Sequence, residues 1–186
     1  MMTAREFVAQ RHELPDGGRW TELVQGKPHS MHPPDQKHGD VVLNISRKVA
    51  ESLIPARPTH AGFDIGVQTR TDPDTVRFPA VSVFTGGERF APIDAMLAEE
   101  CPALVMEIVS TNDRRTTIAE RVYEYHRAGI KKVWVIDPHD EQVTVLRESA
   151  RPLTFSQHER LIDVGLLPGF EVAARELFLE PSWWRG

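Results

Sequence analysis

The amino-acid sequence predicts one domain of mixed α/β class, and three observations support this prediction. The chain has 186 residues, a length that fits a single domain with a sizeable core. Segments with apolar residues at helical spacing alternate with short runs rich in β-branched residues, which are typical of buried strands. No internal repeat, low-complexity tract or linker divides the sequence, so we expect residues 1–186 to form a single domain.

The first half of the sequence predicts two helices and several strands. Thr3 followed by Glu6 has the form of a capping box, which predicts a short helix that ends near Arg11. Turn residues and changes of hydrophobic period mark the elements that follow. These elements are a hairpin over residues 19–31, an amphipathic helix over 38–53, strands over 65–70 and 79–84, and a long surface loop over 86–100.

The second half predicts a strand, a helix and a strand in succession. The apolar run over 103–109 predicts a central strand that is buried on both faces. A helix over 116–128 is expected to end at Gly129. A second buried strand over 133–136 would complete a right-handed parallel crossover, and residues 142–147 would form its hairpin partner.

Charge and composition narrow the classes of partner. The 22 basic and 27 acidic residues give a net charge of −5, so bound nucleic acid would need a local basic groove. Cys101 is the only cysteine, which excludes an intramolecular disulfide and fits a reducing cytoplasm. The sequence lacks a signal-peptide core and any apolar stretch near the ~20 residues of a membrane span. We therefore expect a soluble cytoplasmic protein with no membrane partner.

Several motifs that define enzyme classes are absent. There is no glycine-rich phosphate loop, no Gly-x-Ser-x-Gly elbow, no paired-cysteine zinc site and no His-Glu-x-x-His. His29, His32 and His38 are close in sequence, but no second ligand cluster accompanies them, so we expect exposed loop histidines. Any catalysis would therefore depend on carboxylates.

Glu107 is an acid in the middle of the apolar run 103–109. Burial of an unpaired carboxylate costs several kcal/mol, so such a residue needs a cation, a metal ion or hydrogen-bond donors. One interpretation is that Glu107 belongs to a functional site. The other is that it lies half exposed at the end of the strand, or pairs with an arginine for structural reasons.

A series of short motifs resembles one nuclease family over nearly the entire chain. The motifs include Glu22-Leu23-Val24-Gln25-Gly26, Met31-His32-Pro33-Pro34 with His38 opening a helix, Val76-Arg77-Phe78-Pro79, and residues 101–110, 125–130, 133–138 and 166–170. In this order they resemble the Uma-type putative restriction endonuclease family of the PD-(D/E)XK nuclease superfamily.

The resemblance implies a restriction-endonuclease-like mixed sheet flanked by helices, with a site for Mg²⁺ or Mn²⁺ that hydrolyses phosphodiesters. Glu107 matches the second metal-binding acid of the family, and the backbone carbonyl of Ile108 would be the adjoining ligand. Glu22 matches an acid near the start of many members, where it acts as an outer ligand or orienting group.

The sequence also departs from the family pattern. Ala80 stands where the family has the aspartate that is the first metal ligand. Val109 occupies the lysine position of the superfamily motif, and Arg121 occupies the alternative lysine position four residues before Tyr125. Arginine keeps its proton at all relevant pH values and cannot take part in proton transfer. Asp72 or Asp74 could replace the missing ligand only if the chain brought them back to the site.

These departures lead to two hypotheses. The first is a metal-dependent DNA endonuclease whose active site is weakened or lost; the resemblance implies a homodimer. The second is a non-catalytic descendant that binds nucleic acid or a protein partner. A third possibility is that the domain acts only as a homodimeric scaffold. Arg114, Arg115 and Arg127 accompany Arg121 on or just before the expected helix and could contact phosphates. A solvated helix face, with these arginines paired to neighbouring glutamates, is the alternative.

Overall fold

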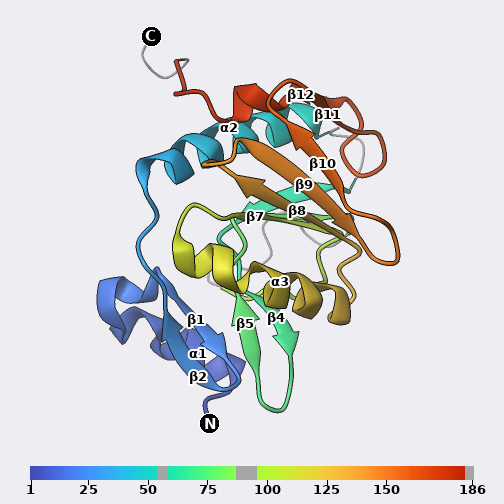
Figure 1. Ribbon diagram of the computed structural model, residues 1–186. Coiled ribbons are helices and arrows are strands. Elements are labelled where there is room, and N and C mark those ends of the chain that lie inside the picture. Colours follow the sequence, from blue (N-terminus) through green and yellow to red (C-terminus); the bar gives the residue numbers. More distant parts are fainter. Residues whose placement is uncertain (54–57, 87–95, 183–186) are drawn as a thin grey trace.

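The computed structural model describes residues 1–53, 58–86 and 96–182. Within these residues it forms a mixed sheet of six strands, in the order β10-β9-β8-β7-β6-β3, and a smaller sheet in the order β2-β1-β5-β4 (Figure 1). The larger sheet consists of β3 (His60–Phe63), β6 (Val81–Phe84), β7 (Leu104–Ile108), β8 (Lys132–Asp137), β9 (Gln142–Arg147) and β10 (Leu153–Ser156). β7 and β8 are parallel, and the other neighbouring strands are antiparallel.

Two helices cover opposite faces of the larger sheet. Side chains alternate along β7, so Met106 and its neighbours at even positions pack beneath α2 (Gln36–Ser52), which contributes Val41, Ile45 and Val49 to the main core. Val105 packs on the other face against Tyr125 of α3 (Asn112–Arg127). α3 lies between the two sheets in Figure 1. Glu107 shares the α3 side with Val105 because the two residues are two positions apart.

The N-terminal helix packs against the smaller sheet. α1 (Ala4–Gln10) begins with the expected capping box between Thr3 and Glu6. The helix packs its Phe7 into a separate small core beneath the sheet. Gln25 and Gly26 join β1 and β2 with φ values of 49° and 72°, the positive pair that a type I′ hairpin turn requires. The strands are β1 (Thr21–Val24), β2 (Lys27–Ser30), β4 (Val67–Arg70) and β5 (Thr75–Arg77), and the short helical turns η1 (Arg11–Glu13) and η2 (Pro15–Gly18) connect α1 to β1.

The C-terminal part of the described chain returns to α2. A two-stranded sheet of β11 (Arg160–Asp163) and β12 (Phe170–Ala173) is followed by the turn η3 (Ala174–Leu177). Asn44 of α2 donates hydrogen bonds to the carbonyl oxygens of Leu177 and Leu179. This segment therefore closes the main core on the side away from α3. None of the helices in the described part of the chain has both the length and the hydropathy needed to cross a bilayer.

Most of the expected elements are confirmed, with shifts at their ends. The hairpin, the 103–109 strand, the parallel crossover and the β8–β9 hairpin are present. α2 begins at Gln36, two residues earlier than predicted, because Asp35 caps it through the amide of His38. α3 begins four residues earlier than predicted. Strands β3, β5, β10, β11 and β12 were not predicted, and most of the expected 86–100 loop lies outside the described residues.

Substitutions of Trp134 would measure how much its packing in the main core stabilises the fold. Trp134 is 1% exposed, lies edge-on to Phe170 with ring centroids 5.2 Å apart, and its Nε1 has no acceptor among the described residues. We expect Trp134→Ala to lower the free energy of unfolding by about 3–5 kcal/mol because it leaves a large cavity. Trp134→Phe should cost below about 2 kcal/mol, since it also removes an unpaired donor. Urea denaturation of both variants checks this; equal losses would contradict it.

Candidate active site

The fold brings together three charged residues that are far apart in the sequence. Glu22 comes from β1 of the smaller sheet, Glu107 from β7 of the larger sheet, and Arg121 from the middle of α3. Their exposed fractions are only 1%, 5% and 2%, respectively. The sequence indicated each of them as a site residue, and the structure places all three in one buried cluster.

Arg121 holds Glu22 with a bidentate pair of hydrogen bonds. Its Nη1 donates to Glu22 Oε2 over 2.5 Å, and its Nη2 donates to Glu22 Oε1 over 2.9 Å. The planar guanidinium matches the carboxylate in this parallel geometry, which is stronger and more directional than a single contact. The backbone N–H of Phe78 donates a further hydrogen bond of 3.0 Å to Glu22 Oε1.

The same guanidinium also holds Glu107. Arg121 Nη2 and Nε donate to Glu107 Oε1 over 2.7 Å and 3.1 Å. The hydroxyl of Tyr125 donates to the same oxygen. Arg121 and Tyr125 are four residues apart, so they lie on one face of α3 and reach Glu107 together. Glu107 Oε2 accepts no hydrogen bond from the described residues, and Glu107 lines an adjacent cleft.

Arg77 extends the cluster away from the cleft. Its Nη1 donates to Glu22 Oε2 over 3.0 Å, while its Nε and Nη2 donate to the two oxygens of Glu124 over 2.7 Å and 3.0 Å. Arg77 comes from β5, which the sequence did not predict as a strand. The two arginines therefore share Glu22, and each holds a second acid on α3 or β7.

The electrostatics of the cluster favour charged side chains in spite of burial. Burial alone would raise the pKa of Glu22, but the charges of Arg121 and Arg77 and the N–H of Phe78 outweigh it and lower this pKa to about 2. Burial would lower the pKa of Arg121, but Glu107 and Glu22 raise it well above its ordinary value. Burial and the charge of Glu107 raise the pKa of Tyr125 well above its ordinary value. Arg121 is therefore a permanent cation between carboxylates.

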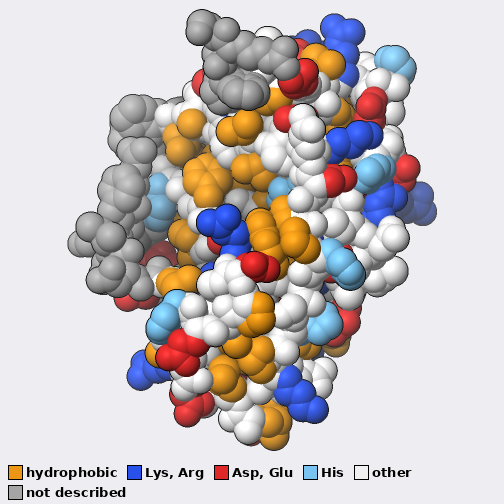
Figure 2. Space-filling view, turned by 90° about the vertical axis from the view of Figure 1, so that its left-hand side faces the viewer, with side chains coloured by type: hydrophobic (Ala, Val, Ile, Leu, Met, Phe, Trp, Pro, Cys, Tyr) orange, Lys and Arg blue, Asp and Glu red, His pale blue; other side chains and the backbone are white. Residues whose placement is uncertain are grey.

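A cleft of about 520 Å³ opens beside this cluster. It lies where β1, the start of α2 and the start of α3 meet, on the side of the molecule that faces the viewer in Figure 2. Hydrophobic side chains gather near the middle of that face, beside charged ones. Glu22, Glu107, Ile108, Ala80 and Arg121 all line the cleft. The position that lacks the expected aspartate therefore faces the same space as the remaining acids.

The structure separates the other arginines expected to contact phosphates. Arg114 is 7% exposed and lines the cleft. Arg115 instead forms an ion pair with Asp137, and its Nε donates to the Val109 carbonyl. Arg127 is exposed and lines a second cavity. The alternative of a solvated helix face is wrong for Arg114 and Arg121, because both are buried. Arg127 is exposed, as that alternative requires.

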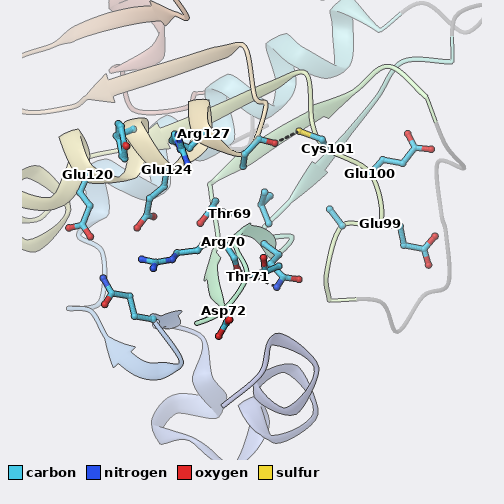
Figure 3. Close-up of a pocket in the computed structure, with 16 residues that line it drawn as sticks. Thr69, Arg70, Thr71, Asp72, Glu99, Glu100, Cys101, Glu120, Glu124 and Arg127 are labelled. Atoms are coloured by element: carbon cyan, nitrogen blue, oxygen red, sulfur yellow. Dashed lines mark hydrogen bonds between the residues drawn. The ribbon is translucent and has the colours of Figure 1, made fainter. Parts of the chain in front are cut away.

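The second cavity, of about 900 Å³, lies on the other side of the Arg77 pair. Figure 3 shows Glu120, Glu124 and Arg127 of α3 opposite the β4 end of the smaller sheet, with Glu99, Glu100 and Cys101 on a third side. Charges of both signs and open exposure make this a solvated surface hollow. Asp72 lies here, and Asp74 accepts a hydrogen bond from the Ala4 amide, so neither acid lines the cleft.

Two residues of the cleft were not identified from the sequence as site residues. Asp64 follows β3 and faces the cleft, and burial raises its pKa. His38 was expected to be an exposed loop histidine, but it lies in the first turn of α2 and its Nδ1 is 3.1 Å from Ser110 Oγ. Burial and the nearby charge of Arg114 lower the pKa of His38 to about 4, so its ring is neutral at pH 7. No local signal could show that β3 returns beside β6.

The arrangement does not fit the divalent metal site that the resemblance implies. Both oxygens of Glu22 and one oxygen of Glu107 already accept hydrogen bonds from Arg121, and Ala80 offers no ligand. Among the described residues no group of three or more His, Cys, Asp or Glu side chains could hold a metal ion. A cation in the cleft would also meet the charge of Arg121.

The comparisons with known proteins show the family of the chain and its fold. A family model described as "Uma2: Putative restriction endonuclease" matches residues 8–175. The chain belongs to the Uma2 family. The match extends over most of the sequence and includes Glu22, Glu107 and Arg121, so the cluster lies within the family domain. No curated protein matches the chain.

A solved structure is similar to this Uma2 chain in its fold. It is the crystal structure of a putative nuclease belonging to DUF820 from Anabaena variabilis ATCC 29413, with a TM-score of 0.75 and 21% sequence identity. The alignment covers 96% of this chain and 98% of that chain. The restriction-endonuclease-like fold expected from the resemblance is therefore confirmed.

Removal of Arg121 should destabilise the fold strongly. Arg121→Ala leaves two buried carboxylates without their shared cation, and we expect a loss of about 3–5 kcal/mol in the free energy of unfolding. Arg127→Ala, which removes an exposed arginine from the same helix, should change the free energy of unfolding by less than about 0.5 kcal/mol. Chemical denaturation of both variants measures the difference. A similar, small effect of the two substitutions would show that the cluster is not stabilised by Arg121.

Acid should remove the stabilisation that Glu22 provides. The folded pKa of about 2 is lower than the ordinary value of 4.5, so the charged form stabilises the fold above pH 4.5. This contribution is lost as the pH falls from about 4.5 to about 2. We expect the stability difference between the parent and Glu22→Gln to shrink over that window in denaturation experiments at several pH values. A difference that stays constant would contradict the lowered pKa.

Proposed function

We propose that this chain is a restriction-endonuclease-like protein whose metal-dependent hydrolysis of DNA is slow or absent. The observation that carries the proposal is the position of Arg121 between Glu22 and Glu107. A hydrolytic site of this class needs carboxylate oxygens that are free to bind Mg²⁺ or Mn²⁺. Here the guanidinium supplies the positive charge that these oxygens would otherwise take from a metal ion.

Chemical differences between arginine and lysine support the same conclusion. A lysine ammonium can lose a proton when it is buried, whereas the pKa of Arg121 is raised well above its ordinary value. Arg121 therefore cannot accept a proton from water. Ala80 removes the first acid, and neither Asp72 nor Asp74 reaches the cleft to replace it. Two parts of the expected machinery, the first acid and the lysine, are thus changed together.

A non-catalytic role in binding nucleic acid is the second candidate, and Arg114 favours it. This arginine faces the cleft from α3. The two acids that line the cleft beside it are held by Arg121 and not by Arg114. A protein partner was the other form of this hypothesis. We keep nucleic acid because a buried guanidinium that faces a cleft suits phosphate better than an apolar protein surface. Pairing of two copies remains part of the proposal, since one cleft reaches one strand.

Restoring the family residues should restore metal binding. Ala80→Asp with Arg121→Lys adds a ligand and removes the bidentate hold on Glu22, so we expect Mn²⁺ binding in the micromolar to low-millimolar range by calorimetry. The parent should give no stoichiometric heat. Nicking of supercoiled DNA by the double variant should exceed that of the parent at least about tenfold, as expected when a general acid–base group is supplied.

The matched control is Glu107→Gln in the restored background, because the amide keeps the shape and removes the negative charge. Both the heat and the nicking should disappear in that triple variant. Stoichiometric binding of Mn²⁺ by the parent, lost in Glu107→Gln alone, would overturn the proposal and indicate a working metal site. Far-ultraviolet circular dichroism of each variant shows whether it folds.

A further inference from the structure

Arg114 carries donor groups that the protein does not use. Its Nη1 donates to the His32 carbonyl and to Thr111 Oγ1, both over 2.9 Å. Its Nε and Nη2 have no acceptor among the described residues, and no carboxylate lies within ion-pair distance of the guanidinium there. The side chain is nevertheless 93% buried, since it is 7% exposed, and it lines the cleft. Buried charges are normally paired, so these donors are suited to an anion that enters the cleft.

His38 adds a neutral polar group to the same part of the cleft. Its Nδ1 lies 3.1 Å from Ser110 Oγ, and its Nε2 has no partner in the described chain. With a pKa lowered to about 4 by burial and by Arg114, the ring stays uncharged at pH 7 and offers one nitrogen to a ligand. Because the His38 ring adds no charge, Arg114 is the source of positive charge for an anion at this end.

Another part of the cleft is aromatic and carries charges of both signs, because Asp64 and Arg19 line it together and Arg19 lies over the Trp20 ring, 5.9 Å from its centroid. Phe63 is 46% exposed although it is a large apolar side chain, and Trp20 and Phe78 line the same space. Asp64 follows Phe63 and faces the cleft as well. The strands β3, β6 and β7 are neighbours, with Phe63 opposite Val81 and Val81 opposite Met106. Two strand spacings therefore separate Phe63 from Met106 of β7 by roughly 10 Å, and β7 leads on to α3 and Arg114.

We propose that the cleft binds a single nucleotide, with its phosphate at Arg114 and His38 and its base against Phe63 and Trp20. A volume of about 520 Å³ suits a ligand of this size. Aromatic rings stack on the faces of bases, and a carboxylate such as Asp64 accepts hydrogen bonds from exocyclic amino groups. This inference rests on the proposed nucleic-acid ligand but does not depend on hydrolysis or on a metal ion.

The competing charges in the cleft are consistent with this orientation. Arg121 already holds Glu22 and Glu107, and Asp35 at the rim accepts from the His38 amide and lies 3.2 Å from His139 Nε2. Asp64 is the remaining acid that lines the cleft, and the charge of Arg19, which lines it as well, acts on Asp64. A phosphate at Arg114 therefore stays on the α3 side of the cleft, away from Asp64. A simple inorganic anion would use only half of this site.

The test is calorimetry with 5′-deoxynucleoside monophosphates in the presence of EDTA. We expect binding of at least one of the four to the parent, and at least about tenfold weaker binding of the matching nucleoside and of inorganic phosphate, because each lacks one half of the contacts. A 5′-phosphorylated trinucleotide distinguishes the source. Tighter binding of the trinucleotide than of the mononucleotide indicates a strand end, and equal binding indicates a free nucleotide.

Matched variants assign the two halves of the site. Arg114→Gln should weaken nucleotide binding about tenfold or more, whereas Arg127→Gln, on the same helix but outside the cleft, should leave it unchanged. Phe63→Ala replaces a half-exposed ring, so it should fold normally and still lose about tenfold. Asp64→Asn should change the order of preference among the four bases without abolishing binding. The Phe63 and Asp64 variants keep the proposal testable if Arg114→Gln fails to fold.

Three outcomes would overturn the inference. These are no binding of any monophosphate to the folded parent, equal binding of inorganic phosphate, or equal losses in Arg114→Gln and Arg127→Gln. Because EDTA removes the metal ion, these results are independent of the Mn²⁺ and nicking experiments. A failure here with restored cleavage by Ala80→Asp and Arg121→Lys would leave the proposed function standing. Nucleotide binding by a parent chain that also binds Mn²⁺ would support this inference and overturn the proposed function.

Discussion

The shared hold of Arg121 on Glu22 and Glu107 is the constraint on which the rest of the site depends. Two buried carboxylates repel each other, and each has lost most of its contact with water. A single guanidinium with donors on two edges compensates both, provided that β1, β7 and α3 keep a fixed arrangement. The contact between the two sheets is therefore set by charge as much as by apolar packing, because α3 carries Arg121 and Tyr125 on the face that lies between them.

Arg77 makes this constraint extend through the protein. It joins Glu22 to Glu124, and Glu124 lines the second cavity. The cleft and that cavity consequently share one row of alternating charges. Removing a charge on one side leaves the next one undercompensated. Glu124 of α3 is thereby linked through Arg77 to the two acids that Arg121 holds.

The sequence predicts the buried acid and its site well, for identifiable reasons. Glu107 is conspicuous because it interrupts a strand of apolar residues, and the family resemblance indicates Arg121 through its position four residues before Tyr125. The family match then confirms the membership that the ordered motifs indicated. Arg77 was missed as a partner because β5 has only three residues, which is too short for a period to be recognised. Asp64 was missed because nothing local shows that β3 lies beside β6.

The burial of α3 could not be predicted for a related reason. A helix with arginines at positions 114, 115, 121 and 127 has few apolar residues, and such a pattern is typical of a solvated face. Only contacts from other elements show that Arg114 and Arg121 point inward. Glu22 and Glu107 hold Arg121, and the His32 carbonyl accepts from Arg114. Tertiary contacts therefore decide the role of each arginine, and the helical pattern alone treats them as equivalent.

The double hold of Arg121 also affects the order in which substitutions can accumulate during evolution. Replacing Arg121 first exposes two buried acids to each other, while introducing an acid at position 80 first adds a third negative charge beside them. Either single step lowers stability before any gain can appear. Descendants of this chain would thus tend to keep the arginine, and a lineage that returned to metal chemistry would need a stabilising background or paired mutations.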